Sequence, residues 1–216
     1  MPALRRSGTG VLETKGELYA KLNKHRASGT EAGKQMAADI GQKLKGIGFD
    51  AVFVSDMLRA VQTAEIILEA GGKSGVPIEK DARLREWCLG CMEAENNAVF
   101  TKNVSDWLGG ITSFAELNER LSEVAAAIYE HDTTGMAEPF QAIESRLKSV
   151  FADTVQKDGM QESTDILIVT HAFAIKTIFH LFAPEQLNGL GKVKNASVSR
   201  LIFENGIFSL EPDIQL

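Results

Sequence analysis

The sequence predicts an α/β fold: a three-layer sandwich with a mostly parallel sheet, an antiparallel edge strand and helices on both faces. Two apolar runs, at residues 51–54 and 166–169, are rich in β-branched residues and do not alternate in polarity, which is typical of strands buried on both faces. Each run is followed by a polar residue and then by helix-forming sequence, the order found in βαβ units. Near the C-terminus, Asn205-Gly206 separates two strand-like runs and predicts a hairpin.

Helices are predicted wherever apolar residues recur at helical spacing. We expect Thr30 to cap the first helix, and Ser55 or Asp56 to cap the second, because their side chains can accept hydrogen bonds from free N–H groups. A third helix is expected over residues 114–130, a fourth from Pro139, which a first turn tolerates, and a last one directly after the second apolar run.

The length of 216 residues suits a single domain over 1–216. Within it, residues 88–137 interrupt the α/β alternation and predict a cap-like helical insertion beside the site. Residues 1–29 are atypical, because residues 1–20 contain no apolar run of the kind that a central parallel strand requires. The first strand is therefore absent, rebuilt from unusual residues, or lost through an alteration of the sequence or its start.

Composition excludes several classes of protein. A formal charge of −6 with 24% charged residues argues against a nucleic-acid-binding surface. No apolar run approaches the ~20 residues that span a bilayer, and the N-terminus has no apolar signal region, so we expect a cytoplasmic protein. Cys88 and Cys91 lack the further ligands of a zinc site and are interpreted as incidental reduced thiols. No metal or cofactor is predicted.

Three residues are candidates for chemistry, because ligands of open α/β sheets bind at the carboxyl ends of strands. Arg59 follows the first apolar run and would lie in the first turn of a helix, where free N–H groups and a guanidinium fork attract anions. A surface arginine paired with Asp56 or Glu65 is an equally good interpretation. His171 follows the second run; taken alone, it is more simply a buried, hydrogen-bonded histidine.

Glu86 is the third candidate. It stands between Leu84 and Trp87, and apolar surroundings can raise the pKa of a carboxyl group and make it a general acid. Composition alone would favour a glutamate paired with Arg83 or Arg85.

Four motifs in order resemble the histidine phosphatase superfamily, which includes the cofactor-dependent phosphoglycerate mutases and their phosphatase relatives. The motifs are the helix start at 30–35, Ser55-Asp56-x-x-Arg59-Ala60-x-Gln62-Thr63-Ala64, Leu84-Arg85-Glu86 followed by Gly90, and Val169-Thr170-His171. The resemblance covers residues 30 to 208. Ala172 stands where the family usually has glycine.

The resemblance implies a phosphohistidine mechanism. Carried over by position, Arg59 is a phosphate clamp, Glu86 the proton donor to the leaving oxygen, and His171 the second histidine that holds the phosphoryl group. These roles agree with the chemistry, since the transferring group needs preorganised cations and the leaving alkoxide needs a proton.

The family's nucleophile, the histidine of an Arg-His-Gly motif, is not found at any of the four histidines, His25, His131, His171 and His180. Two degenerate alignments are open: one over residues 4–9 puts Arg6 at the nucleophile position, and the other matches residues 13–15 to Arg-His-Gly. His25 lies too close to Gly33 and is interpreted as a loop residue.

The function that the sequence favours is a phosphatase acting on a small phosphate monoester. One alternative is a catalytically inactive relative that binds a phosphorylated ligand or inorganic phosphate, or serves as a scaffold. A second is a phosphoglycerate mutase, which the many acids of residues 88–137 disfavour; phosphorylation of His171 itself is disfavoured too. We expect no nucleic-acid or membrane partner. An exposed edge at Val198–Phe203 could pair two copies into an oligomer.

Overall fold

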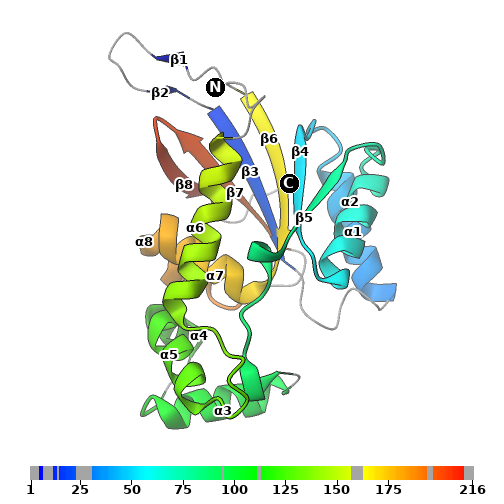
Figure 1. Cartoon of the computed structure of the whole chain (residues 1–216). Coiled ribbons are helices and arrows are strands. Elements are labelled where there is room, and N and C mark those ends of the chain that lie inside the picture. The colour runs from blue at the N-terminus through cyan, green and yellow to red at the C-terminus, as the bar shows by residue number, and fades with distance from the viewer. Residues whose placement is uncertain are drawn as a thin grey trace.

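The computed structural model describes residues 5–6, 12–13, 15–22, 31–93, 95–110, 113–156, 163–193 and 197–211. Its main sheet has six strands in the order β5-β4-β6-β3-β7-β8 (Figure 1). In chain order the strands are β3 (Lys15–Leu22), β4 (Ala51–Ser55), β5 (Ile78–Asp81), β6 (Ser163–Thr170), β7 (Val198–Glu204) and β8 (Ile207–Glu211). Two short strands, β1 (Arg5–Arg6) and β2 (Leu12–Glu13), form a separate antiparallel ladder.

Strands β5, β4, β6 and β3 run parallel, whereas β7 runs antiparallel to β3 and β8 antiparallel to β7. The predicted mostly parallel sheet and its C-terminal hairpin are therefore confirmed. The expected exposed edge at Val198–Phe203 is wrong, because β8 folds back along the outer side of β7 and pairs from Arg200 to Glu204.

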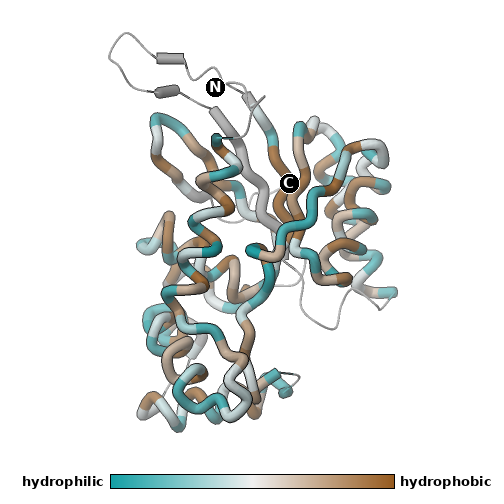
Figure 2. The backbone as a smooth tube through the Cα atoms, in the orientation of Figure 1, coloured by the Kyte–Doolittle hydropathy of each residue, from teal (hydrophilic) through white to brown (hydrophobic). Residues whose placement is uncertain are grey.

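The two apolar runs are divided between the two faces of the sheet. Phe53 and Ile168 face one hydrophobic cluster, while Val54 and Val169 face the other, because successive side chains of a strand point to opposite faces. Figure 2 shows the apolar colouring along β4 and β6. A continuous apolar run thus serves a strand that is covered on both sides.

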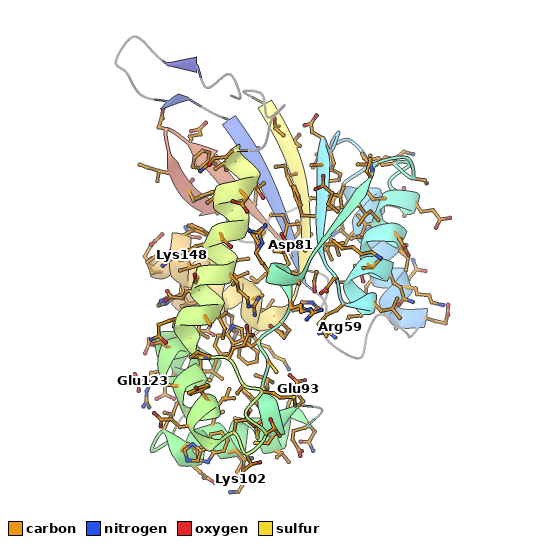
Figure 3. All side chains as sticks on the ribbon, viewed as in Figure 1. Arg59, Asp81, Glu93, Lys102, Glu123 and Lys148 are labelled. Carbon is orange, nitrogen blue, oxygen red and sulfur yellow. The ribbon has the colours of Figure 1, made fainter. Side chains whose placement is uncertain are left out.

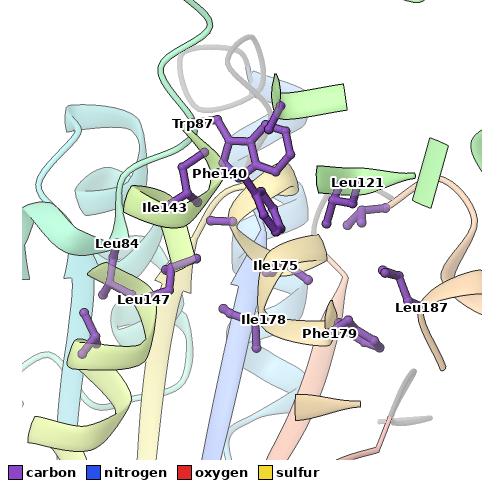
Figure 4. Packing of buried hydrophobic residues seen from close by; sticks show 14 of the residues in the cluster. Leu84, Trp87, Leu121, Phe140, Ile143, Leu147, Ile175, Ile178, Phe179 and Leu187 are labelled. Carbon is purple, nitrogen blue, oxygen red and sulfur yellow. The ribbon is translucent and has the colours of Figure 1, made fainter. Parts of the chain in front are cut away.

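Helices complete the two outer layers. One face is covered by α1 (Glu31–Lys43) and α2 (Leu58–Ala70), and the other by α6 (Phe140–Gln156), α7 (Ala172–Phe182) and the short α8 (Pro184–Leu187). The cluster that Phe53 and Ile168 face also includes Trp87, Leu147 and Phe179, each almost fully buried (Figure 4).

The segment expected as a helical insertion holds α3 (Asn97–Trp107), α4 (Phe114–Glu119) and α5 (Leu121–His131). These helices lie beyond α7, past the carboxyl ends of the strands (Figure 1). Short 3-10 turns at Ala82–Leu84, Gly90–Met92 and Asn188–Leu190 join the elements.

The expected caps at the start of α2 are wrong. The N-cap of α2 is Met57, whose side chain makes no capping hydrogen bond. Ser55 and Asp56 are unavailable for capping because their side chains bind His171 and Arg85 instead. Thr30, the expected cap of the first helix, lies outside the described residues.

The first strand of the sheet is present, although the sequence shows no apolar run for it. β3 pairs with β6 from Lys15–Ser163 to Leu22–Thr170, and its other side pairs with β7. Backbone ladders on both sides place this strand, so its position does not depend on an apolar pattern.

None of the helices in the described part of the chain has the length and apolar character needed to cross a membrane.

Close approach of α1 and α2 depends on Gly41. A β-carbon at this position would overlap the carbonyl oxygen of Ile67 and lie 2.8 Å from the Cβ of Ala70. We expect Gly41→Ala to lower the free energy of unfolding by about 1–3 kcal/mol, since overpacking outweighs the gain in helix propensity of up to ~1 kcal/mol.

Chemical denaturation would measure this change, with Gly46→Ala as the control, because a β-carbon there meets no atom within 4 Å. Equal effects of the two substitutions would contradict the proposed contact between the helices.

Candidate active site

The candidate residues gather where the carboxyl ends of the central strands meet. Ser55 ends β4, Thr170 ends β6, and His171 follows as the N-cap of α7. Because these strands are parallel and adjacent, their ends lie at one edge of the sheet.

His171 is completely buried. Its Nε2 lies 2.8 Å from the hydroxyl oxygen of Ser55, so the two side chains share a hydrogen bond across the ends of β4 and β6. The simpler interpretation of His171, a buried and hydrogen-bonded histidine, therefore describes its surroundings correctly. The same contact holds the ring at the edge of the sheet where the other candidates lie.

The carboxylate of Glu86 is bound to the N-terminus of α7. It accepts hydrogen bonds from the backbone N–H groups of Phe173, at 3.0 and 3.2 Å, of Ala174 at 3.0 Å and of Trp87 at 3.1 Å. The first N–H groups of a helix have no partner within the helix, and its dipole favours a negative charge there.

The alternative interpretation, in which Glu86 pairs with Arg83 or Arg85, is wrong. Arg83 binds Asp81 and Asp153, and Arg85 binds Asp56. Burial raises the pKa of Glu86 above its ordinary value, while the three backbone N–H donors and the positive charge of Arg59 oppose that rise. Desolvation is the larger effect, as the sequence context predicted.

Arg59 lies in the first turn of α2 and is half-buried. Burial lowers the pKa of its guanidinium, and the carboxylates of Glu86 and Glu93 oppose this change. Figure 3 shows Arg59 near the lower ends of the central strands, with Glu93 below it. Asp56, one of its two expected partners, instead forms an ion pair with Arg85 at 2.5 Å.

Trp87 anchors the segment that carries Glu86. Its indole N–H donates to the hydroxyl of Thr177 at 3.0 Å, and its ring stacks on Phe173 with 4.8 Å between centroids. It also meets Phe140 edge-on (Figure 4). The residue next to Glu86 is thus fixed to the helix whose N-terminus the Glu86 carboxylate binds.

Gly90, which follows Glu86 in the family motif, allows a close contact between the first and last parts of the insertion. Its backbone has φ +55°, and a β-carbon would overlap the carboxylate of Asp132. That carboxylate accepts hydrogen bonds from the N–H groups of Cys91 and Ala137. A glycine is required here both by its φ angle and by the space that Asp132 occupies.

A cavity of about 340 Å³ adjoins Glu86, within the range of pockets that bind small molecules. It is lined by residues from the end of the sheet, the insertion and α6: Met57, Ala82, Arg85, Glu86, Trp87, Cys88, Glu93, Glu138 and Arg146.

Sequence reasoning missed four of the residues that shape this region, namely Ser55 as the partner of His171, Glu93, Glu138 and Arg146. Only Ser55 carried a usable signal, since it directly follows the predicted strand at 51–54. The other three are ordinary charged residues of a loop, a helix start and a helix.

The structure does not support either alignment for a nucleophile, because the aligned residues that it describes lie away from His171. Arg6 lies in β1, which pairs with β2 outside the six-stranded sheet. Lys15 begins β3 opposite Ser163, at the end of the sheet remote from His171. The strand instead ends at Leu22, beside Thr170. Thr14 and His25 lie outside the described residues.

Within the residues that the structure describes, no three His, Cys, Asp or Glu side chains are grouped so that they could hold a metal ion. Cys88 and Cys91 are both free thiols.

Comparison with known proteins identifies the fold and the family. Residues 30–212 match the model of the histidine phosphatase superfamily, branch 1. The protein named "Probable phosphoglycerate mutase GpmB" from Erwinia tasmaniensis is 28% identical over 174 residues, which cover 80% of this chain and 72% of that protein. The 2,3-bisphosphoglycerate-dependent phosphoglycerate mutase of Streptococcus pyogenes is 38% identical over 79 residues, 36% of this chain and 34% of that protein.

Solved structures show the same architecture. The phosphoglycerate mutase from Bacillus anthracis matches with a TM-score of 0.82 and 25% identity, and the match covers 93% of each chain. A mycobacterial glucosyl-3-phosphoglycerate phosphatase shares the fold with a TM-score of 0.66 and 18% identity, over 92% of this chain and 97% of that one. The predicted fold class and the family resemblance are both confirmed.

The raised pKa of Glu86 predicts a pH-dependent stability. A glutamate whose pKa is higher in the folded state binds protons more readily there, so stability decreases as pH rises through its folded pKa. We expect Glu86→Gln to raise Tm at about pH 8 and to have almost no effect below about pH 4, where the carboxyl is protonated in both states.

Thermal unfolding over this pH range would measure the change. Glu65→Gln is the control, because Glu65 is exposed on α2. A constant difference between wild type and Glu86→Gln at all pH values would contradict the predicted shift.

Proposed function

Because this chain belongs to the histidine phosphatase superfamily, branch 1, we propose that it is a phosphatase that hydrolyses a small phosphate monoester. The observation that carries the proposal is the convergence of three separate segments. Arg59 lies at the start of α2, the Glu86 carboxylate binds the first turn of α7, and the buried His171 ring lies between the ends of β4 and β6; the charges of Arg59 and Glu86 interact. A small-molecule cavity adjoins Glu86.

The residues take distinct roles in the proposed reaction. Arg59 and His171 bind the oxygens of the phosphoryl group, whose charge must be met by preorganised cations and donors. Glu86, with its raised pKa, transfers its proton to the leaving oxygen as the phosphorus–oxygen bond breaks. The family resemblance implies a phosphohistidine that water then hydrolyses to inorganic phosphate, which regenerates the histidine. We assign no residue as that nucleophile.

The charges around the cavity favour hydrolysis over mutase chemistry. A mutase must bind the carboxylate of phosphoglycerate as well as its phosphate. The arginines that line the cavity, Arg85 and Arg146, are already paired with Asp56 and Glu138. Glu93, which also lines the cavity, adds negative charge beside Arg59. These pairings support a phosphatase, although the sequence relatives carry the names of mutases.

A second candidate function is that of an inactive relative that binds a phosphorylated ligand. It is favoured by one observation: no histidine in the sequence is preceded by Arg and followed by Gly, and β3 contains no histidine. The proposed clamp of Arg59 and His171 would then bind phosphate without transferring it.

We also propose that residues 1–216 act as one domain in which residues 88–137 form a cap over the site. Support comes from Cys88 and Glu93, which line the cavity, and from α3–α5, which lie past the strand ends (Figure 1). The free thiols of Cys88 and Cys91 support a cytoplasmic location.

Hydrolysis of 4-nitrophenyl phosphate tests the lead proposal. We expect turnover by the wild type. With 2-glycerol phosphate, whose alkoxide leaving group must be protonated, we expect kcat to fall by about 10²–10⁴-fold in Glu86→Gln, because the leaving oxygen then lacks its proton donor. Arg59→Gln is expected to reduce kcat/KM by about 10²–10³-fold through loss of charge stabilisation.

Glu65→Gln, on the exposed face of α2, serves as the control that retains activity. Turnover of 2-glycerol phosphate that is unchanged in Glu86→Gln would contradict the role of Glu86. If the wild type shows no turnover, the phosphatase proposal fails and the second candidate function, an inactive relative that binds a phosphorylated ligand, takes its place.

Phosphate binding distinguishes that second candidate from a scaffold. We expect inorganic phosphate to raise Tm, with about 2.7 kcal/mol of stabilisation at a concentration of about 100 times Kd. The shift should disappear in Arg59→Gln and persist in Arg120→Gln, since Arg120 pairs with Glu123 in the insertion. If phosphate does not raise Tm in the wild type, neither the phosphatase nor the ligand-binding proposal holds.

A further inference from the structure

All five N–H donors of Arg146 are used in hydrogen bonds. Nη1 donates to the carbonyl oxygens of Arg83 and Arg85, both at 2.7 Å, and Nη2 to the carbonyl oxygen of Glu86 at 3.1 Å. The remaining donors bind the two carboxylate oxygens of Glu138, at 2.9 and 3.0 Å. The side chain is only 14% exposed, and all of these bonds except the one to the carbonyl oxygen of Arg85 are partly shielded from water.

Glu138 extends this contact to Cys88, two residues after Glu86. Its Oε2 accepts a hydrogen bond from the N–H of Cys88 at 3.0 Å, and its own N–H donates to the carbonyl oxygen of Cys88 at 3.3 Å. Arg146 and Glu138 therefore bind the backbone on both sides of Glu86. They do so from α6 and the segment before it, whereas the Glu86 side chain is bound from α7.

We propose that Arg146 is a positioning residue that holds the backbone of Glu86 so that its carboxyl lies between the N-terminus of α7 and Arg59. The proposal rests on the role of Glu86 as proton donor in the proposed function. Arginine suits this task because its planar fork reaches three carbonyls and one carboxylate at once. Lysine has three donors around a single nitrogen and cannot reproduce the pattern.

The alternative is that Arg146 contributes only to general stability, as a partly buried ion pair with Glu138. The two roles differ in what they affect. An ion pair that acts on stability alone changes the fraction of folded protein and affects all substrates equally. A positioning residue changes the reaction where the proton from Glu86 matters most, because small displacements of a catalytic group cost large factors in rate.

The test compares two esters that differ in their need for a proton donor. 4-Nitrophenyl phosphate has a good leaving group, and 2-glycerol phosphate has an alkoxide leaving group that must be protonated. We expect Arg146→Lys to lower kcat for 2-glycerol phosphate by about tenfold more than kcat for 4-nitrophenyl phosphate, with KM nearly unchanged. In Glu86→Gln, kcat for 2-glycerol phosphate should again fall more than kcat for 4-nitrophenyl phosphate, and the difference between the two losses should be larger.

Arg120→Lys is the matched control, because Arg120 donates to the carbonyl oxygen of Leu108 and to Glu123 within the insertion. It should leave both rates unchanged. Equal losses for both esters in Arg146→Lys would overturn the positioning role while leaving the proposed phosphatase function intact. If Arg146→Lys does not fold, Glu138→Gln replaces it, because this substitution weakens the hydrogen bonds that hold the same guanidinium. In Glu138→Gln, kcat for 2-glycerol phosphate should fall more than kcat for 4-nitrophenyl phosphate, with a smaller difference than in Arg146→Lys. Equal losses for both esters would also overturn the positioning role.

A second measurement does not depend on activity. The amides of Phe173 and Ala174 are hydrogen-bonded to the Glu86 carboxylate, so their hydrogen exchange reports where that carboxylate lies. In Arg146→Lys we expect exchange at these two amides to rise by about tenfold or more. Exchange at Phe179, later in the same helix, should stay the same.

This measurement separates failure of the inference from failure of the proposed function. If the wild type hydrolyses neither ester, the phosphatase proposal fails, and exchange at Phe173 and Ala174 still decides whether Arg146 positions Glu86. Unchanged exchange at both amides, or a uniform rise along α7, would overturn the inference.

Discussion

The hydrogen bonds between the Glu86 carboxylate and the first turn of α7 connect the parts of the candidate site. They join the segment after β5 to α7, the helix whose N-cap is His171. The N–H groups of Phe173 and Ala174 have no acceptor within the helix and would otherwise need water or a ligand. A carboxylate placed here is both stabilised by the helix and kept beside the strand ends.

Burial and charge act in opposite directions at this position. Desolvation raises the pKa of Glu86, and the helix N-terminus and Arg59 partly offset it. A raised pKa favours the protonated form of the carboxyl, which a proton donor requires. The neighbouring Asp56 differs, because the direct ion pair with Arg85 holds the pKa of its carboxyl below the ordinary value. Two acids near the same strand ends are therefore suited to different tasks.

Several elements were predictable because their signals are local. The strands at 51–54 and 166–169, the hairpin at Asn205-Gly206 and the helices around them follow from periodicity and turn chemistry. β3 was not predictable, since ladders to β6 and β7, distant in sequence, place it. The pairing partners of the charged residues were also misjudged. Arg83 and Arg85 both stand just before Glu86 in the sequence, yet they bind Asp81 and Asp56.

The sequence by itself determined the fold class, the family and the strand ends at which Arg59, Glu86 and His171 stand, because motif order and apolar periodicity are properties of a linear chain. Only the tertiary structure decided which groups these residues contact. Ser55 meets His171 across 116 positions, and Arg146 reaches the carbonyl of Glu86 across 60. Such contacts depend on how helices pack on the sheet, and local sequence carries no record of that geometry.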